Sequence, residues 1–338
     1  MNNHNMKLIL LVSVILWLSA PKMLKAQDTQ IKGFAHTDVT LQDDKVNFGF
    51  GEWDLFITSE LSQRFSFLGE TVFKYALQSP TNFSVGVERL IISYNYKGNH
   101  SFLIGKHHTP INYWNVFYHH GRVFFPTIDR PILFAAKIIP IHTTGIALQG
   151  DNLGGIRFGY NVMIGNGRGS GDILDNDSYK SVTAAVHIKP KDQLQIGLSY
   201  YNDVISEDVE IGGNPLGEKV KQNMITASLS HFGKNFEVLT EASWISNNGD
   251  STGVANNFAA YFYAGWRIKE KFIPYFRYDN LTFGDAELIY FRDNTNSYIG
   301  GFRYEINYLI VVKFEYQHFD REIAGFSDRL SAQIAIGF

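Results

Sequence analysis

The 338-residue sequence contains no cysteine and, beyond its first 26 residues, no apolar run of transmembrane-helix length. Without cysteine there is neither a disulfide framework nor thiolate chemistry. Without about 20 consecutive apolar residues, the mature chain has no membrane-spanning helix. Beyond the first 26 residues, 27 basic residues stand against 33 acidic ones, for a net charge of about −6 with histidine neutral. This balance argues against nucleic-acid binding.

The first 26 residues have the pattern of an export signal. Lys7 precedes an apolar run over residues 8–20, and Ala26 offers a small residue just before Gln27. A charged start, a short apolar stretch and a small residue at the cut are typical of a signal peptide. The run is too short for a membrane anchor. We therefore expect a signal peptide over residues 1–26, with Met6 an equally suitable start, and a single mature domain over residues 27–338.

Aromatic residues are abundant, at 15% of the chain, and apolar residues alternate with polar ones along most of the mature chain. This period of two predicts strands with one apolar and one polar face. We expect sixteen strands, near residues 29–40, 45–60, 64–77, 83–97, 99–107, 140–150, 154–166, 178–190, 192–204, 221–233, 234–247, 255–268, 271–282, 295–307, 308–320 and 325–338. A membrane protein without apolar helices has one architecture left, the closed β-barrel.

The second expected strand contains a break in its phase. Phe48 and Phe50 lie on the opposite phase from Trp53, Leu55 and Ile57. An inserted residue at a β-bulge reverses the faces of a strand in this way. We therefore expect either a bulge between Phe50 and Trp53 or an incorrect assignment of the faces there.

The connections between the expected strands are of two kinds that alternate. Links after even-numbered strands are short, as at 97–99, 190–191 and 269–271, whereas most links after odd-numbered strands are long and polar, at 107–140, 167–177, 205–220, 248–254 and 283–294. Transmembrane barrels have short turns on one side and long loops on the other. A β-propeller would repeat a four-strand motif at about 40–50 residues, and no such repeat is present. A large β-sandwich would also alternate, but it explains neither the signal nor the phased loops.

The last expected strand has a recognisable pattern. Leu330, Ile334 and Ile336 alternate with small or polar residues, and Phe338 ends the chain. This arrangement resembles the C-terminal assembly signal of bacterial outer-membrane proteins. The resemblance implies an outer-membrane location, contact with lipid and with the barrel assembly machinery, and a role for Phe338 in assembly.

The longest expected connection, residues 107–140, is too rich in apolar and aromatic residues for a free surface loop. It is the third long-side connection of a sixteen-stranded barrel. Here the chain resembles general and phosphate-selective bacterial porins, in which the third external loop folds inward and narrows the pore. The resemblance implies an all-β transmembrane barrel with an inward-folded third loop, and porins of this kind are usually homotrimers. The constriction residues expected from it are His107, His108, Tyr113, Trp114, Tyr118, His119, His120, Arg122, Asp129 and Arg130.

The histidines of this segment allow two interpretations. A metal site or a pH-sensitive gate is one. A polar rim bonded to the barrel wall and to water is the other, and it is favoured because no ligand spacing is diagnostic. A turn at Asp129, Arg130 and Pro131 could pin the segment to the wall. The aspartates 172, 175 and 177 lack the spacing of a calcium loop. We expect neither a metal nor a cofactor.

If apolar side chains face lipid, the charged residues between them face the lumen. The charges expected to line the pore are Arg89, Arg157, Glu237, Glu241, Arg267, Arg277, Asp279, Arg303, Glu305, Lys313 and Glu315, together with Glu70. Opposed charges at a constriction select solutes by charge. The alternative is that neighbours such as Arg303, Glu305, Lys313 and Glu315 neutralise one another. Because both signs occur about equally, we expect weak ion selectivity.

The leading functional hypothesis is a porin that passes small hydrophilic solutes by diffusion and has no enzymatic activity, since a barrel of sixteen strands leaves an aqueous channel. An outer-membrane barrel lipase or protease is the second hypothesis. No G-x-S-x-G motif and no spaced nucleophile and base support it. A surface adhesin or receptor is the third, and it favours a narrower, filled barrel.

Overall fold

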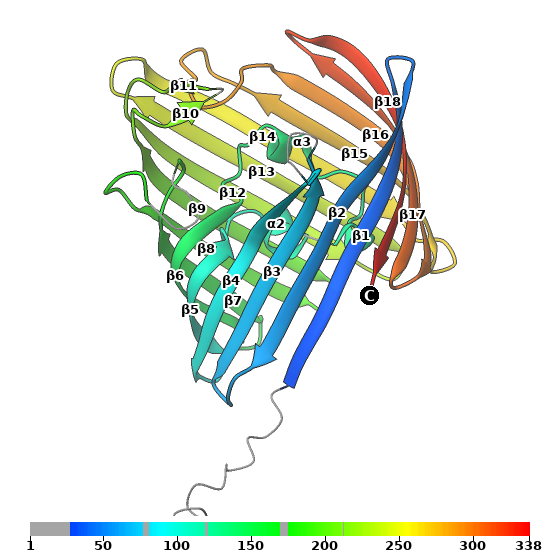
Figure 1. Cartoon of the computed structure of the whole chain (residues 1–338), viewed down its shortest axis with the longest axis horizontal. Helices are drawn as coiled ribbons and strands as arrows, with labels where there is room; N and C mark the ends of the chain where they lie inside the picture. Colours follow the sequence, from blue (N-terminus) through cyan, green and yellow to red (C-terminus); the bar gives the residue numbers. More distant parts are fainter. Residues whose placement is uncertain (1–27, 77–80, 119–120, 170–174, 212) are drawn as a thin grey trace, which may run out of the picture.

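The computed structural model describes residues 28–76, 81–118, 121–169, 175–211 and 213–338, and in these ranges the chain forms a closed antiparallel β-barrel (Figure 1). Sixteen strands follow one another around the wall in chain order, and β1 closes the barrel by pairing with β18. The expected signal peptide lies outside the described residues. Sixteen strands of alternating pattern therefore close on one another and leave no free sheet edge.

The first eight wall strands run from β1 to β8, and they are β1 (Asp28–Gln42), β2 (Lys45–Glu60), β3 (Phe65–Tyr75), β4 (Phe83–Lys97), β5 (His100–His108), β6 (His142–Leu153), β7 (Phe158–Gly165) and β8 (Ser181–Lys191). The others are β9 (Leu194–Ile205), β12 (Val220–Phe232), β13 (Phe236–Gly249), β14 (Gly253–Trp266), β15 (Phe272–Thr282), β16 (Thr295–Asn307), β17 (Ile310–Arg321) and β18 (Gly325–Gly337). A separate small hairpin is formed by β10 (Glu210–Ile211) and β11 (Asn214–Pro215).

The expected strands all occur, with boundaries that differ by at most four residues. Two details were wrong. The connection expected at 248–254 is short, because β13 runs to Gly249 and β14 starts at Gly253. Arg157, expected within a strand, lies in the turn before β7 with a positive φ of 50° and pairs with Asp192 of the next turn. A tight turn needs such a backbone conformation, which a strand does not provide.

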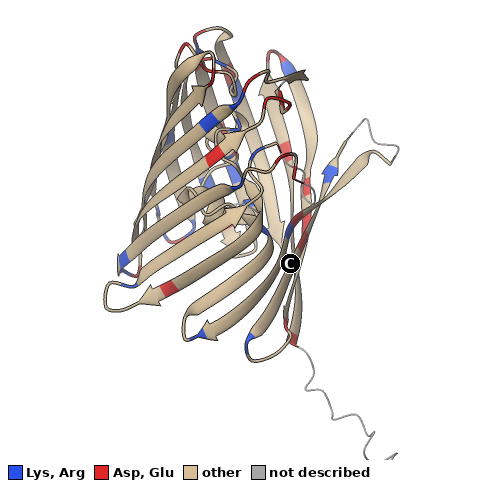
Figure 2. Ribbon diagram, turned by 90° about the vertical axis from the view of Figure 1, so that its left-hand side faces the viewer, with Lys and Arg blue, Asp and Glu red and all other residues tan. Residues whose placement is uncertain are grey.

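The two faces of the wall differ as the alternation predicts. On β18, Ile334 and Ile336 are 43% and 38% exposed, whereas Ser331 and Gln333 are buried. In Figure 2 many of the Lys and Arg residues lie at or near the turns, and long stretches of strand carry no charge. The outer surface is therefore a belt of exposed apolar side chains, and the polar side chains gather inside. Among the described residues, no helix is long and apolar enough to cross a membrane.

The expected bulge in β2 is confirmed. Ala35 pairs with Trp53 and Thr37 with Phe50, so that Gly51 and Glu52 share one position of the partner strand. A second register shift lies in β4, between β3 and β4. A bulge lets two successive residues avoid strict alternation. These two bulges lie close to the site described below.

Candidate functional site

Residues 107–140 lead from the end of β5 to the start of β6 and contain three short helices, α2 (Tyr113–Phe117), η1 (Arg122–Phe124) and α3 (Ile132–Ala135). We call residues 109–141 the inner segment, omitting 119–120, which the structure does not describe. Trp114, Leu133 and Ile138 of the inner segment are fully buried, in one cluster with inward-facing side chains of β9 and β12–β16. A long connection with its own packed core is held in place by burial.

A carboxylate of the wall holds the first helix of the inner segment. Glu241 of β13 accepts hydrogen bonds from the backbone N–H groups of Tyr113 and Trp114, the second at 2.9 Å, and from the Tyr261 hydroxyl. The first N–H groups of a helix have no partner within the helix. Glu241 supplies that partner from across the chain, so α2 is fixed to β13.

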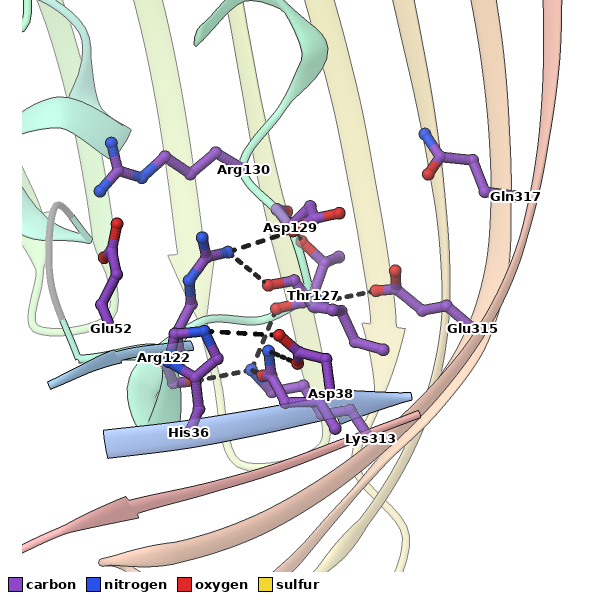
Figure 3. Close-up of polar contacts among 12 residues, drawn as sticks. His36, Asp38, Glu52, Arg122, Thr127, Asp129, Arg130, Lys313, Glu315 and Gln317 are labelled. Atoms are coloured by element: carbon purple, nitrogen blue, oxygen red, sulfur yellow. Dashed lines mark hydrogen bonds and ion pairs between the residues drawn. The ribbon is translucent and has the colours of Figure 1, made fainter. Parts of the chain in front are cut away.

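Basic and acidic residues of β15–β17 hold the turn between η1 and α3. Arg277 donates to the carbonyl oxygen of Asp129 at 2.6 Å, and Lys313 donates to those of Arg122 and Thr127 at 2.6 and 3.0 Å. Glu315 accepts the N–H of Ile128 at 2.6 Å. Figure 3 shows Lys313 and Glu315 pointing at this turn from β17. We call Arg277, Arg303, Lys313 and Glu315 the anchor residues, because Arg303 also donates to the Pro126 carbonyl at 3.2 Å.

The anchor residues face inward, as expected, but each is at most 5% exposed. The alternative, by which Arg303, Glu305, Lys313 and Glu315 merely neutralise one another, holds only in part. Arg303 pairs with Glu305 and with Glu237 of β13, whereas Lys313 and Glu315 contact the inner segment. The reason is that the inner segment offers carbonyl and N–H groups closer than the neighbouring charges.

The other expected pore-lining residues form local pairs. Arg267 bonds Glu237 and Glu305 at 2.7 Å each, near one end of the barrel. Asp279 is fully buried and pairs with Arg277 at 3.1 Å. Arg89 bonds the buried Glu70 across β3 and β4.

The turn Asp129, Arg130 and Pro131 is bound to the wall. Arg329 of β18 and Arg122 bond the Asp129 carboxylate at 2.6 and 3.3 Å. Burial alone would raise the pKa of Asp129, but the guanidinium groups of Arg122, Arg329 and Arg277 hold it below its ordinary value. Asp129 therefore stays ionised and ties the inner segment to β18.

The part of the barrel wall opposite this turn carries a cluster of acidic residues that the sequence analysis did not predict. The bulges of β2 and β4 bring Glu52 and Glu88 inward, where both bond Lys74, at 3.1 and 3.4 Å. His142 lies 3.0 Å from Glu88. The phase break at Phe50 was a usable signal for Glu52. We call Glu52, Asp54 and Glu88 the acidic wall.

Arg122 and Arg130 of the inner segment face the acidic wall. In Figure 3 the Arg130 side chain extends toward the side where Glu52 lies, away from Lys313 and Glu315. Burial and the neighbouring Arg122 lower the pKa of Arg130, and the carboxylates of Glu52, Glu88 and Asp54 counteract them. Basic residues on the inner segment thus oppose acidic residues on the wall, which creates a field across the space between them.

The four histidines expected at the constriction do not form one described cluster. His107 is buried at the end of β5, and His108 lies 5.4 Å from His142, ring centre to ring centre. His119 and His120 lie outside the described residues. Within the described ranges, no three His, Cys, Asp or Glu residues form a group that could hold a metal ion. Of the aspartates considered for calcium, Asp175 bonds Lys180, Asp177 bonds Ser206, and Asp172 is not described.

Several solved structures share this architecture at low sequence identity. A trimer form of OmpT, an outer-membrane protein of Vibrio cholerae, is 11% identical with a TM-score of 0.69 over 93% of this chain and 100% of its own. An anion-selective porin from Comamonas acidovorans is 12% identical with a TM-score of 0.69, over 92% and 100%. OmpF of Salmonella typhi is 12% identical with a TM-score of 0.66, over 92% and 97%. The chain has a porin fold. No family model and no curated protein matches it.

Proposed function

We propose that this protein is an outer-membrane channel that lets small hydrophilic solutes diffuse passively, without catalysis or a cofactor. The observation that carries this proposal is the closed sixteen-stranded wall with exposed apolar side chains outside and polar side chains inside. Barrels of this size enclose an aqueous passage, whereas barrels of about eight strands are filled by their own side chains.

The apolar outer face and polar inner face of the barrel wall also support a location in the outer membrane. The exposed apolar belt suits the hydrocarbon layer of a membrane. Short turns, such as those between β4 and β5 and between β8 and β9, suit the periplasmic side, and the long connections suit the outside. Export by residues 1–26 and recognition of Phe338 by the barrel assembly machinery belong to the proposal. A structural role of Phe338 at the barrel seam supports this part of the proposal. Its backbone N–H donates to the carbonyl of Gly33 on β1 at 2.9 Å, and its carbonyl accepts the N–H of Gly33 at 2.8 Å, so that Phe338 helps to close the barrel.

The inner segment is the proposed constriction. It packs on β9 and β12–β16 and is anchored to β17 and β18, so we place the passage along the remaining wall, from β2 to β8. In this arrangement the anchor residues hold the constriction, and Arg122, Arg130 and the acidic wall border the passage. Because positive and negative groups face one another there, we expect weak ion selectivity.

A homotrimer is the proposed assembly. Its support is the fold shared with the trimer form of the Vibrio cholerae protein. Cross-linking of the purified protein in detergent, followed by light scattering, measures the number of chains. A monomeric mass at all protein concentrations would reject the trimer and leave the channel proposal standing.

Single-channel recording in planar bilayers tests the channel itself. We expect discrete nanosiemens-scale steps in concentrated potassium chloride and swelling of proteoliposomes in small neutral solutes. Heat-denatured protein from the same preparation is the control. Folded protein that inserts but neither conducts nor swells liposomes would reject the proposal and favour an outer-membrane enzyme or an adhesin.

A further inference from the structure

A cavity lies away from the acidic wall, between α2 and the inner faces of β6–β9. Its volume is about 250 Å³. This value is close to the lower end of small-molecule sites, about 300 Å³. We call it the α2 cavity and consider what its two sides can bind.

One side of the α2 cavity is apolar and aromatic. Tyr113, Val116 and Phe117 line it from α2. The rings of Tyr113 and Phe117 are stacked with centres 4.5 Å apart, and Phe117 is 49% exposed although it belongs to the interior of the barrel. Large apolar side chains exposed in a group commonly mark a binding surface. The stacked pair offers a flat platform to a ligand with an apolar face.

The opposite side of the cavity is polar but carries balanced charge. Gln149, Asn161 and Gln195 contribute amide groups. The charged residues there are paired, because Asp151 bonds Lys189 at 3.1 Å and His187 at 3.0 Å. A site whose charges already neutralise one another has little attraction for an ion. Asn161 Nδ2 donates to Gln149 Oε1 at 3.3 Å, so these two amides satisfy each other in part. A purely apolar ligand would leave the remaining amide atoms without partners, which costs free energy.

Polar atoms without partners border the same cavity. Asn112, next to α2, is 4% exposed, and within the described part of the chain both its Oδ1 and its Nδ2 atoms have no hydrogen-bond partner. Oδ1 of Asn161, on the polar side, also has none among the described residues. Buried polar groups are nearly always bonded, so such atoms indicate a ligand or water that supplies the partner.

We infer that the α2 cavity binds a neutral polyhydroxylated solute, of the size of a mono- or disaccharide. The ring face of the sugar, rich in C–H groups, stacks on Phe117 and Tyr113. Its hydroxyl groups donate to and accept from the amides of Asn112, Gln149 and Asn161. This inference rests on the proposed channel function and names a class of solute for it.

Maltose titration of the conducting protein tests the inference. We expect maltose to reduce the potassium chloride current in a saturable way, whereas a polyethylene glycol of matched hydrodynamic size gives only the small decrease due to excluded volume. Phe117→Ala should raise the half-blocking maltose concentration about five- to tenfold, because an aromatic platform is lost. Calorimetry in detergent measures the same binding without conduction.

Phe124→Ala is the matched control. Phe124 belongs to the same inner segment and is also 49% exposed, but it lines a different cavity and packs on Phe34. Its replacement should leave the maltose titration unchanged.

Full conductance without saturable block or calorimetric binding would overturn the inference and leave the channel standing. Equal effects of the two variants, or equal block by the polyether, would also overturn it. Calorimetric binding lost only in Phe117→Ala, in protein that does not conduct, would support the site and reject the channel.

Discussion

The ammonium group of Lys313 on β17 donates a hydrogen bond of 2.6 Å to the backbone carbonyl of Arg122, 191 residues earlier in the chain. The same ammonium reaches the Thr127 carbonyl at 3.0 Å and Gln333 of β18 at 3.2 Å. A single wall residue therefore holds two points of the inner segment and the neighbouring strand. This explains why a charged side chain lies fully buried on a strand that faces a channel.

Lys313→Met should loosen the inner segment without opening the barrel. The variant keeps a similar length but loses hydrogen bonds from a charged donor, each worth about 1.5–3 kcal/mol. We expect larger or noisier single-channel currents and a lower midpoint of urea unfolding, while the backbone pairs of β17 with β16 and β18 keep the barrel closed. Lys271→Met is the control, because Lys271 also bonds a backbone carbonyl, that of Ile306 at 3.0 Å, but lies exposed at a turn. Quiet currents of unchanged size in Lys313→Met would contradict the anchoring role.

Arg130→Gln should shift the ion selectivity toward cations. The variant removes a positive charge that faces the acidic wall, and a unit charge about 4 Å away is worth about 1 kcal/mol even in water. We therefore expect the permeability ratio of potassium to chloride to rise by about two- to fivefold, measured as a reversal potential under a salt gradient.

Lys137→Gln makes the same change of charge on the same segment and serves as the comparison. The Lys137 side chain is exposed and lies past α3. Screening by salt weakens charges exposed to water. A shift in Lys137→Gln as large as that in Arg130→Gln would mean that selectivity reflects net charge and not the constriction.

The conductance should be flat between pH 5 and pH 8 and change only in more acidic solution. The pKa of Asp129 is lowered from its ordinary value of 3.8 because paired guanidinium groups outweigh its burial. A depressed carboxyl pKa stabilises the folded state above the ordinary value, and this stabilisation is lost as the pH falls through the lowered value. As the pH falls below 3.8 toward this lowered pKa, the bonds from Arg122 and Arg329 to Asp129 should weaken and the inner segment should loosen.

Asp129→Asn should show this acidic behaviour already at neutral pH, because the amide carries no charge. Recordings of both proteins from pH 3 to pH 8 make the comparison. A transition of the unaltered protein centred between pH 5 and pH 8 would instead indicate another titratable group of the interior, such as His142 beside Glu88, and would revive the pH-sensitive gate.

The strands could be predicted from sequence because burial on one face only imposes a period of two. The phase break after Phe50 even indicated the bulge that brings Glu52 inward. Glu88 was missed, although Val87 and Leu90 are both exposed and so break the phase of β4 in the same way. A bulge inserts only one extra residue into a strand, so the alternation of apolar and polar residues is interrupted at a single position, which is easily overlooked in the sequence.

The partners of the inward charges could not be predicted in the same way. Alternation fixes the side to which Glu241 or Arg277 points, but it carries no information on what lies there. Their partners are backbone groups of the inner segment, which come from the path of an irregular connection. Irregular backbone follows contacts distant in sequence, and no local periodicity records them. The cavity beside Asn112 depends on the same path.

Gly105→Ala should disturb the pairing of β4 and β5. Gly105 has a φ of 132°, and a Cβ atom there would lie 1.9 Å from the carbonyl oxygen of Leu90. The strands would have to separate, in addition to a conformational cost of about 1–3 kcal/mol for a non-glycine residue. We expect a lower urea midpoint and a smaller fraction of folded barrel, measured by its heat-dependent migration in gels. Gly86→Ala on β4 is the matched control, because a Cβ atom there meets nothing within 4 Å. If both variants fold to the same extent and unfold at the same urea concentration, the close approach of Gly105 to Leu90 does not limit the packing of this wall.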